Sequence, residues 1–429
     1  MIHFREARAA AIRILRDSTG EGKWVKRAVL IEDLFGKCRA LLWLAESAPG
    51  NFADDFSAEM HRNLEIYWAG LWVGGGSNPA DEKLYGEIWA TSNEIAPSLR
   101  LSERVRSRGF WMKPPGEPAW EVDEHAPPVI AFYSFKGGVG RTTALVSFAL
   151  QRVRIGDTVV VIDLDLDAPG VATLLDSNAA EEQQFGMVDY LIESPLQPKT
   201  KLSDYYRSCP DVAGPGRAFV FPAGLLDSDY LAMLARLDLE PISDINEHPL
   251  SKLLNDVRGE LKPDWILLDC RAGLSEASGF ALSGLANLTV LLGTTSIQSW
   301  HGLRLVIERL GAERFRLGMP QAECVVVQTM TPENPETAES AKSNFLAEAE
   351  KVFREVYYAE DPVDEDDDAF WYVRDMESED APHRPSVLYY SQRLAFIRDL
   401  REVADTLVED AAYAKLGIRL ASRFAREPE

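Results

Sequence analysis

The chain has 429 residues, of which 46% are hydrophobic and 26% are charged, so it has ample apolar material for globular cores. Its 45 basic and 68 acidic residues give a formal charge of −23, which works against non-specific binding to nucleic acid or to anionic lipid. We therefore expect neither nucleic acid nor a membrane as the main partner, although locally basic segments leave both open.

Two kinds of sequence feature are missing, and this excludes further classes of protein. The four cysteines stand apart, without a CxxC pair or a histidine at metal-ligand spacing, which argues against a zinc site and a disulfide framework. No stretch approaches the roughly 18–20 consecutive apolar residues of a membrane span, and the charged N-terminus lacks the pattern of a signal peptide. These features predict a cytoplasmic protein.

The first 125 residues predict a small, mostly helical domain. Apolar residues recur at three- to four-residue spacing through 1–48, and 52–73 and 84–95 also fit helices. Seven of the ten tryptophans fall in this region, where they either fill a core or form a binding surface. We expect residues 1–125 to sense or bind a protein partner. The proline-rich stretch 113–128 then predicts a stiff linker.

From residue 126 to 429 the pattern changes to short apolar runs that alternate with helical stretches. This alternation predicts an α/β domain with a mainly parallel sheet flanked by helices. The runs are apolar almost throughout, as strands covered on both faces are. The expected strands are 129–134, 158–163, 218–222, 265–269, 288–292 and 324–328.

A glycine-rich loop separates the first of these strands from a helix. Residues 132–143 read FYSFKGGVGRTT. In a strand–loop–helix unit of this kind, backbone N–H groups and the positive helix end converge on one point, which suits a polyphosphate. The glycines let the backbone turn without Cβ clashes, and Thr142 is placed to offer its hydroxyl to Mg²⁺.

The stretch KGGVGRTT, residues 136–143, resembles the deviant Walker A motif of the MinD/ParA/Mrp class of P-loop ATPases. The resemblance implies a P-loop NTPase-type sheet, ATP and Mg²⁺ as cofactors, and an ATP-dependent homodimer in which Lys136 reaches the partner's phosphates. Arg141 departs from the class, because it stands where the usual P-loop lysine would be, as in a KGGVGR variant group. The implied nucleotide-binding residues are Lys136, Gly137, Gly138, Val139, Gly140, Arg141, Thr142, Thr143 and, at the adenine side, Gln328.

Two later motifs fit the same class. Residues 159–167 read as an apolar strand ending in alternating carboxylates, and the resemblance assigns Asp163 and Asp165 to Mg²⁺ and the attacking water. Residues 264–269 read as a Walker B-like strand, followed by Arg271 in a loop similar to the class's switch loop. Arg271 contacts either phosphate or a partner subunit, or forms an ion pair. The implied metal site comprises Thr142, Asp163 and Asp269, and the implied catalytic residues are Lys136, Arg141 and Asp165.

Arg141 keeps the positive charge of the loop but carries it as a planar fork, so we expect secure nucleotide binding and slow hydrolysis. The expected function is an ATP-held regulatory switch that signals to a partner, and the loop variant also resembles components of bacterial anti-phage systems. Two alternatives stay open. One is a membrane- or DNA-positioning ATPase, with the basic segment 413–426 as a membrane anchor. The other is a nucleotide-binding scaffold without turnover.

Overall fold

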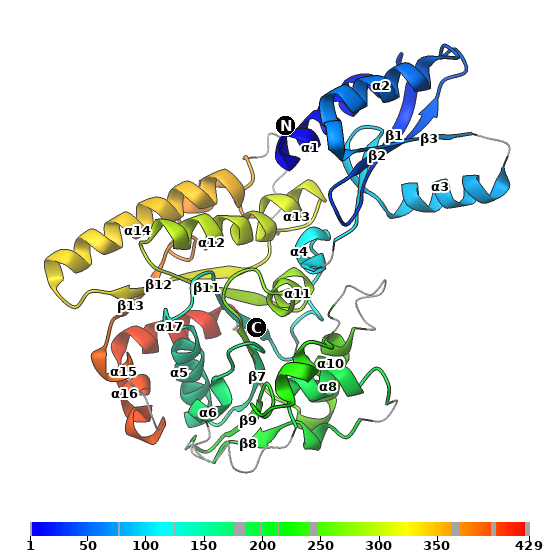
Figure 1. The fold of residues 1–429 in the computed structure, drawn as a ribbon. Helices are drawn as coiled ribbons and strands as arrows, with labels where there is room; N and C mark the ends of the chain where they lie inside the picture. The colour runs from blue at the N-terminus through cyan, green and yellow to red at the C-terminus, as the bar shows by residue number, and fades with distance from the viewer. Residues whose placement is uncertain are drawn as a thin grey trace. The chain divides into compact units, whose positions relative to one another are not determined.

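The computed structural model describes residues 2–424 apart from 76–77, 106, 124, 176–184, 198–199, 211, 213, 238, 240–247, 362–368 and 396–399. The chain divides into two compact units, residues 1–107 and 108–429 (Figure 1). Each unit has its own sheet and its own hydrophobic core.

The first unit has helices on both faces of a five-stranded mixed sheet. Its elements are α1 (Phe4–Ser18), β1 (Val25–Glu32), β2 (Cys38–Leu44), α2 (Phe52–Leu64), the 3-10 helix η1 (Glu65–Tyr67), β3 (Trp68–Gly74), α3 (Pro79–Thr91), β4 (Asn93–Ala96) and β5 (Leu99–Glu103). The strand order is β3-β2-β1-β5-β4. Leu15 of α1, Leu30 of β1 and Met60 of α2 share the main core, whereas α3 packs on the opposite face against Trp43 and Trp72.

The expectation of helix throughout residues 1–48 is wrong beyond Ser18. Residues 25–44 form the antiparallel hairpin of β1 and β2 instead. Three consecutive residues of β1, 28–30, are buried, because both faces of the sheet are covered. Without polar residues between them, they lack the alternation by which a strand is distinguished from a helix.

The hairpin turn carries its own signal in an aspartate. Oδ1 of Asp33 accepts hydrogen bonds from the N–H groups of Phe35 and Lys37, at 2.8 and 2.9 Å. Side-chain-to-backbone bonds of this kind stabilise turns. The helix predicted over 52–73 likewise ends at Leu64 and is followed by β3, so this unit is mixed α/β rather than mostly helical.

The second unit is an α/β layer structure around an eight-stranded sheet. Its first half comprises α4 (Gly109–Met112), β6 (Val129–Ser134), α5 (Arg141–Arg154), β7 (Thr158–Leu164), α6 (Val171–Leu175), α8 (Met187–Glu193), η2 (Leu202–Asp204), β8 (Arg207–Ser208), β9 (Arg217–Phe221), α9 (Tyr230–Leu234) and α10 (Pro249–Leu261). The second half comprises β10 (Trp265–Cys270), α11 (Glu276–Gly284), β11 (Leu288–Gly293), α12 (Ile297–Leu310), α13 (Ala312–Arg316), β12 (Cys324–Thr331), α14 (Pro335–Val356), η4 (Val373–Glu377), β13 (Ser386–Tyr389), α15 (Gln392–Ala395), η5 (Leu400–Glu402), α16 (Ala404–Glu409) and α17 (Ala411–Ser422).

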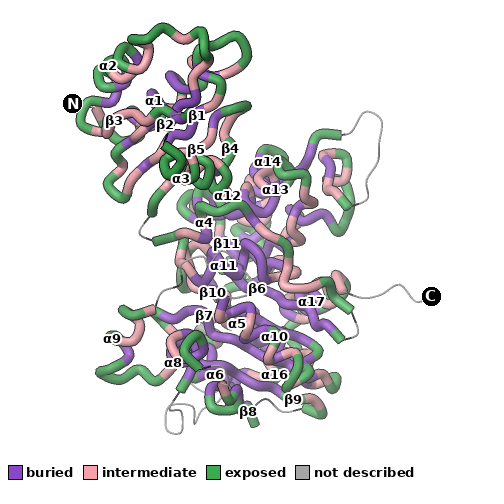
Figure 2. Tube along the Cα trace, turned by 90° about the vertical axis from the view of Figure 1, so that its right-hand side faces the viewer, coloured by how far each residue is buried: buried purple, intermediate pink, exposed green. Residues whose placement is uncertain are grey.

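Helices cover both faces of this sheet, as predicted for residues 126–429. The strand order is β13-β12-β11-β6-β10-β7-β9-β8, and every pairing except that of β8 is parallel. Ile130 and Phe132 of β6 enter the core shared with α5, α16 and α17, while Ala131 and Tyr133 enter the core shared with α11, α12 and α14. Figure 2 shows the central strands as buried along their length. All six expected strands are present, and β8 and β13 are added at the two edges.

The segment 108–128 belongs to the second unit and is not a free linker. Arg309, which is 3% exposed, donates hydrogen bonds to the backbone carbonyls of Phe110 and Lys113, both at 2.6 Å. The indole of Trp111 donates to the carbonyl of Ser275 at 2.7 Å. Because a buried guanidinium requires acceptors, these contacts fasten the proline-rich segment to the domain. The division between the units therefore falls at 107–108 rather than at the predicted residue 125.

Helix α17 carries most of the basic segment considered as a membrane anchor; residues 425–426 lie outside the described part. Its residues Tyr413, Leu416 and Leu420 are buried in the core beside α5. A Cβ on Gly417 would collide with the side chain of Gln151 on α5, so the two helices approach closely. The apolar face of α17 is thus used within the domain. None of the described helices combines the length and apolar character that a bilayer-spanning segment needs.

Candidate functional site

The loop between β6 and α5 presents a row of unused backbone donors. No backbone N–H of residues 136–143 donates a hydrogen bond to another described residue. Gly138 and Gly140 have φ values of +70° and +83°, which residues with a Cβ rarely adopt. A Cβ built on Gly137, Gly138 or Gly140 would meet nothing within 4 Å, so this side of the loop is open. Together with the positive end of α5, the loop offers the donors and the space that a polyphosphate needs.

Three aspartates gather beside this loop, where β7 and β10 end. Asp163 and Asp269 are paired in register on these adjacent parallel strands, and they are 0% and 1% exposed. Asp165 follows two residues later and is 9% exposed. Because the carboxyl ends of parallel strands meet at one edge of a sheet, the fold brings the three predicted acidic residues to the glycine loop.

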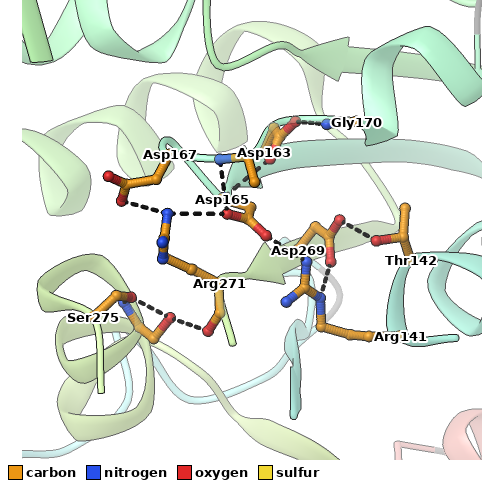
Figure 3. Close-up of polar contacts among 11 residues, drawn as sticks. Arg141, Thr142, Asp163, Asp165, Asp167, Gly170, Asp269, Arg271 and Ser275 are labelled. Atoms are coloured by element: carbon orange, nitrogen blue, oxygen red, sulfur yellow. Dashed lines mark hydrogen bonds and ion pairs between the residues drawn. The ribbon is translucent and has the colours of Figure 1, made fainter. Parts of the chain in front are cut away.

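The guanidinium of Arg141 lies between two of these carboxylates (Figure 3). Its Nε is 2.6 Å from Oδ1 of Asp269, and its Nη2 is 3.0 Å from Oδ2 of Asp165. The side chain is only 10% exposed, and no hydrogen bond joins its Nη1 to any described residue. Thr142 completes the arrangement, since its hydroxyl donates to Oδ2 of Asp269 at 2.8 Å.

Backbone N–H groups hold the remaining carboxylate oxygens. Asp163 accepts from the N–H of Asp165 at 3.0 Å and from that of Gly170 at 3.2 Å. Oδ1 of Asp165 accepts from the N–H of Ala168 at 3.2 Å. Every oxygen of the three carboxylates therefore has a donor already. Across the described residues, no three acidic, histidine or cysteine side chains are grouped to hold a metal ion. A Mg²⁺ ion held by Thr142, Asp163 and Asp269 would lie beside the like charge of the Arg141 guanidinium, so the implied ion does not fit this arrangement.

Burial and charge set the protonation of the cluster. Burial, followed by the charge of Asp269, raises the pKa of Asp163 above the usual range of a carboxyl. Burial also raises the pKa of Asp269, against the opposing effects of Arg141 and Thr142. For Arg141, burial alone would lower the pKa, but Asp269 and Asp165 outweigh it, and the net pKa lies above the ordinary value. Arg141 is thus the fixed positive charge of the cluster.

Lys136 and Arg271 occupy different surroundings. Lys136 is exposed at the front of the loop and forms no ion pair with a described residue. Nη1 of Arg271 lies 2.6 Å from Oδ2 of Asp167 and 3.7 Å from Oδ1 of Asp165. Of the roles predicted for Arg271, the structure shows the ion pair. The exposed ammonium of Lys136 is available for contact with another molecule.

A cavity of about 250 Å³ opens next to the glycine loop. Its lining includes Gly140 and Thr143 from the loop and the first turn of α5, and Met330, Tyr389 and Tyr390 from β12, β13 and the residue after β13. Both tyrosines border the cavity and are 42% exposed, and the ammonium of Lys342 lies 5.5 Å from the centre of the Tyr389 ring. Aromatic rings beside a phosphate loop provide a surface on which a nucleobase can stack.

Gln328, the predicted adenine-side residue, is 1% exposed within β12 and does not line this cavity. The pairing of β12 with β13 is irregular between Gln328 and Thr331, and Met330 there has a φ of +55°. Such an irregularity redirects the side chains that follow it. The two tyrosines were missed because β13 was not predicted, and their sequence signal is only the apolar pair 387–388 directly before them.

The mainly parallel sheet, the loop after β6 and the strand-end carboxylates define a P-loop NTPase-type fold, as the sequence predicted. No protein-family model matches the chain, and no curated protein sequence does.

Several solved structures are similar to this chain at low sequence identity. A ParA family ATPase from Chlorobium tepidum is 14% identical over 70% of this chain and 100% of that chain, with a TM-score of 0.44. A putative plasmid partition protein from Borrelia burgdorferi, bound to AMPPNP, is 15% identical over 68% and 99% of the two chains, with a TM-score of 0.43. The septum site-determining protein MinD from Pyrococcus horikoshii, complexed with Mg-ADP, is 16% identical over 70% and 96%, with a TM-score of 0.42.

Proposed function

We propose that the second unit binds a nucleoside triphosphate, with ATP as the expected ligand, and acts as a nucleotide-dependent switch. The observation that carries this proposal is the row of unused N–H groups at residues 136–143, beside the guanidinium of Arg141. The phosphates would occupy the open side of the loop, and the base would enter the cavity that Tyr389 and Tyr390 line.

Titration calorimetry of the full chain with ATP tests this proposal. Gly140 and Gly156 both have positive φ and open space around a built Cβ, but only Gly140 belongs to the loop. We expect Gly140→Ala to weaken ATP binding at least about tenfold, since it distorts the donor row, and Gly156→Ala to leave it unchanged. The absence of ATP binding by the wild-type chain, or equal effects of the two substitutions, would refute the proposal.

The switch is proposed to be an ATP-dependent homodimer. Lys136 supports it, because this ammonium is exposed at the loop and has no ion-pair partner among the described residues. With AMPPNP present, light scattering of the wild-type chain should report twice the monomer mass, and Lys136→Ala should remain monomeric. Lys351→Ala, which removes a surface ammonium on α14 that is 63% exposed, is the control and should still dimerise.

Hydrolysis is proposed to be slow. Both Arg141 and Asp165 are expected to act on the terminal phosphate and its attacking water, but here they are bound to each other. A charge that is already neutralised contributes less to the charge developing in a transition state. A non-hydrolysing scaffold is the alternative that the same ion pair favours. Phosphate release above the level of an Asp165→Ala control supports the ATPase, and release equal to it supports the scaffold.

The first unit is proposed to contact a protein partner. Phe4, Phe35 and Ile66 are 38%, 73% and 66% exposed, and the ring of Phe4 packs 5.9 Å from that of Tyr67 and against the Gly36 turn. Exposed apolar side chains grouped in this way are typical of protein-binding surfaces. A partner retained by the wild-type chain should be lost with Phe35→Ser and kept with Leu84→Ser, which alters an exposed leucine of α3. A role in bacterial defence stays a prediction of the sequence resemblance.

A further inference from the structure

Arg141 contacts Asp269, which belongs to the implied metal site, and Asp165, which is assigned to the attacking water. In P-loop sites the carboxylate at the end of the Walker B-like strand and the first-turn Thr hydroxyl serve Mg²⁺, and the loop lysine serves the phosphates. Here Asp269 accepts from Arg141 at 2.6 Å and from Thr142 at 2.8 Å, so each of its oxygens already has one donor, and one of these donors is charged. The positive charge beside Asp269 and Asp165 is supplied by the chain itself.

The remaining donors of Arg141 point to its second contact. Nε and Nη2 bind the two carboxylates, and Nη1 has no partner among the described residues. The guanidinium is a rigid fork, so it can hold carboxylates with one edge and phosphate oxygens with another. A lysine ammonium is a single point of charge and lacks this separation of edges. Arg141 is therefore able to bridge acid and phosphate, as a metal ion does.

The binding of a divalent cation in this cluster would be electrostatically unfavourable. The ion would either share Asp269 and Asp165 with Arg141, whose side chain is 10% exposed, or displace Arg141 from them. In both cases the guanidinium would lie as a like charge next to the metal ion, where burial weakens solvent screening. Asp163 is 0% exposed, and each of its oxygens already accepts one backbone N–H, so it offers the ion no solvent-facing oxygen.

We propose that Arg141 takes the place of the divalent cation at Asp269 and Asp165, so that this site binds the metal-free nucleoside triphosphate. The inference rests on the proposed nucleotide binding and deepens it by naming the form of the ligand. Arg141 is thereby the residue that decides whether nucleotide binding depends on a metal ion. The substitution Arg141→Lys would make binding metal-dependent.

Calorimetric titration of the full chain with ATP, once in EDTA and once in excess MgCl₂, tests the inference. For the wild type we expect dissociation constants within threefold of each other. For Arg141→Lys we expect binding at least tenfold tighter with MgCl₂ than with EDTA. Wild-type binding that is lost in EDTA overturns the inference but leaves nucleotide binding intact. Absence of binding under both conditions overturns the proposed function, and the inference with it.

A second measurement addresses the metal without nucleotide. Electron paramagnetic resonance of added Mn²⁺ should show only free ion with the wild type. Arg141→Met removes the guanidinium while keeping much of its length, and it should bind one Mn²⁺ per chain at the uncovered carboxylates. Arg152→Lys, which alters an ion pair with Asp157 at 2.6 Å, is the matched control and should behave as the wild type. Mn²⁺ bound by the wild type at the same affinity as by Arg141→Met overturns the inference.

Discussion

Nε of Arg141 lies 2.6 Å from Oδ1 of Asp269, although the two residues are 128 positions apart in the chain. The contact joins the first residue of α5 to the end of β10, and the side chains are only 10% and 2% exposed. A buried ion pair is costly to break from one side, because the remaining charge has neither solvent nor partner. The stability of the second unit should therefore depend on this pair.

Asp269→Asn should lower the free energy of unfolding by about 3 kcal/mol, since it leaves Arg141 with one charged acceptor. Urea denaturation followed by circular dichroism measures the loss. The control is Asp405→Asn, because Asp405 pairs with Arg154 but its side chain is 81% exposed. An exposed pair contributes less than about 1 kcal/mol. Similar losses for the two variants would contradict the prediction.

Tyr390→Ala should weaken ATP binding by about 1–3 kcal/mol, the range observed when an aromatic ring under a base is removed. The ring borders the cavity beside the glycine loop. Tyr390→Phe keeps the stacking surface and should bind ATP within about twofold of the wild type. Calorimetry with both variants distinguishes stacking from a role of the hydroxyl, and equal losses would show that the ring does not contact the base.

Arg309→Met should destabilise the segment 108–116, because the carbonyls of Phe110 and Lys113 lose their buried donor. Each buried polar group left unpaired costs about 1–3 kcal/mol. We expect limited chymotrypsin digestion to cut after Phe110 or Trp111 at least several-fold faster than in the wild type. Arg316→Met removes a side chain that is 65% exposed and should leave the rate unchanged. An unchanged rate in Arg309→Met would show that other contacts hold the segment.

His248 should make stability fall as the pH is lowered. It is 2% exposed, caps α10 by accepting from the N–H of Leu250, and burial lowers its pKa to about 4 from 6.5. The unfolded chain protonates this imidazole below about pH 6.5, whereas the folded chain does so only below about pH 4. The free energy of unfolding is therefore unaffected by His248 above pH 6.5 and falls as the pH is lowered from 6.5 to 4. At pH 5 the loss from this residue is about 2 kcal/mol.

Urea denaturation at pH 7 and pH 5 measures this effect. His248→Asn keeps a capping side chain without the ionisable ring, so its loss between the two pH values should be smaller than that of the wild type by about 2 kcal/mol. Equal losses in wild type and variant would place the pH dependence elsewhere, for example at His383, whose pKa burial also lowers to about 4.

The strands of the second unit could be predicted because each is a short, uniformly apolar run between turns. The glycine loop could be predicted because it stands between an apolar run and a helical stretch. The aspartates of β7 and β10 could be predicted because they end apolar runs and match the motifs of the class that the loop resembles. The edge strand β13 could not, since its four residues, 386–389, give no periodic signal. In the first unit, the hairpin 25–44 was missed because a sheet covered on both faces removes the alternation of apolar and polar residues.

The contacts of the Arg141 side chain could not be predicted from the sequence either. A cation at the start of α5 faces either the phosphate side of the loop or the acids at the strand ends, and only the positions of Asp165 and Asp269 decide between them. The hydrogen bonds that hold the proline-rich segment on the domain could not be predicted for a similar reason. Its acceptors are backbone carbonyls, which carry no sequence signature, and its donor, Arg309, comes about 200 residues later.

The strand order β6-β10-β7 determines when the centre of the sheet can form during synthesis of the chain. Strand β10 inserts between two strands that are made long before it, and it brings the main acceptor of Arg141. At roughly 5–20 residues per second, the ribosome takes about 6–26 s to make the intervening stretch. Until then β6 and β7 lack their shared neighbour, and the cationic loop has only the acids of β7. The proposed nucleotide site therefore stays incomplete until β10 has been made, and a nascent chain that stops before Asp269 lacks the main acceptor of Arg141.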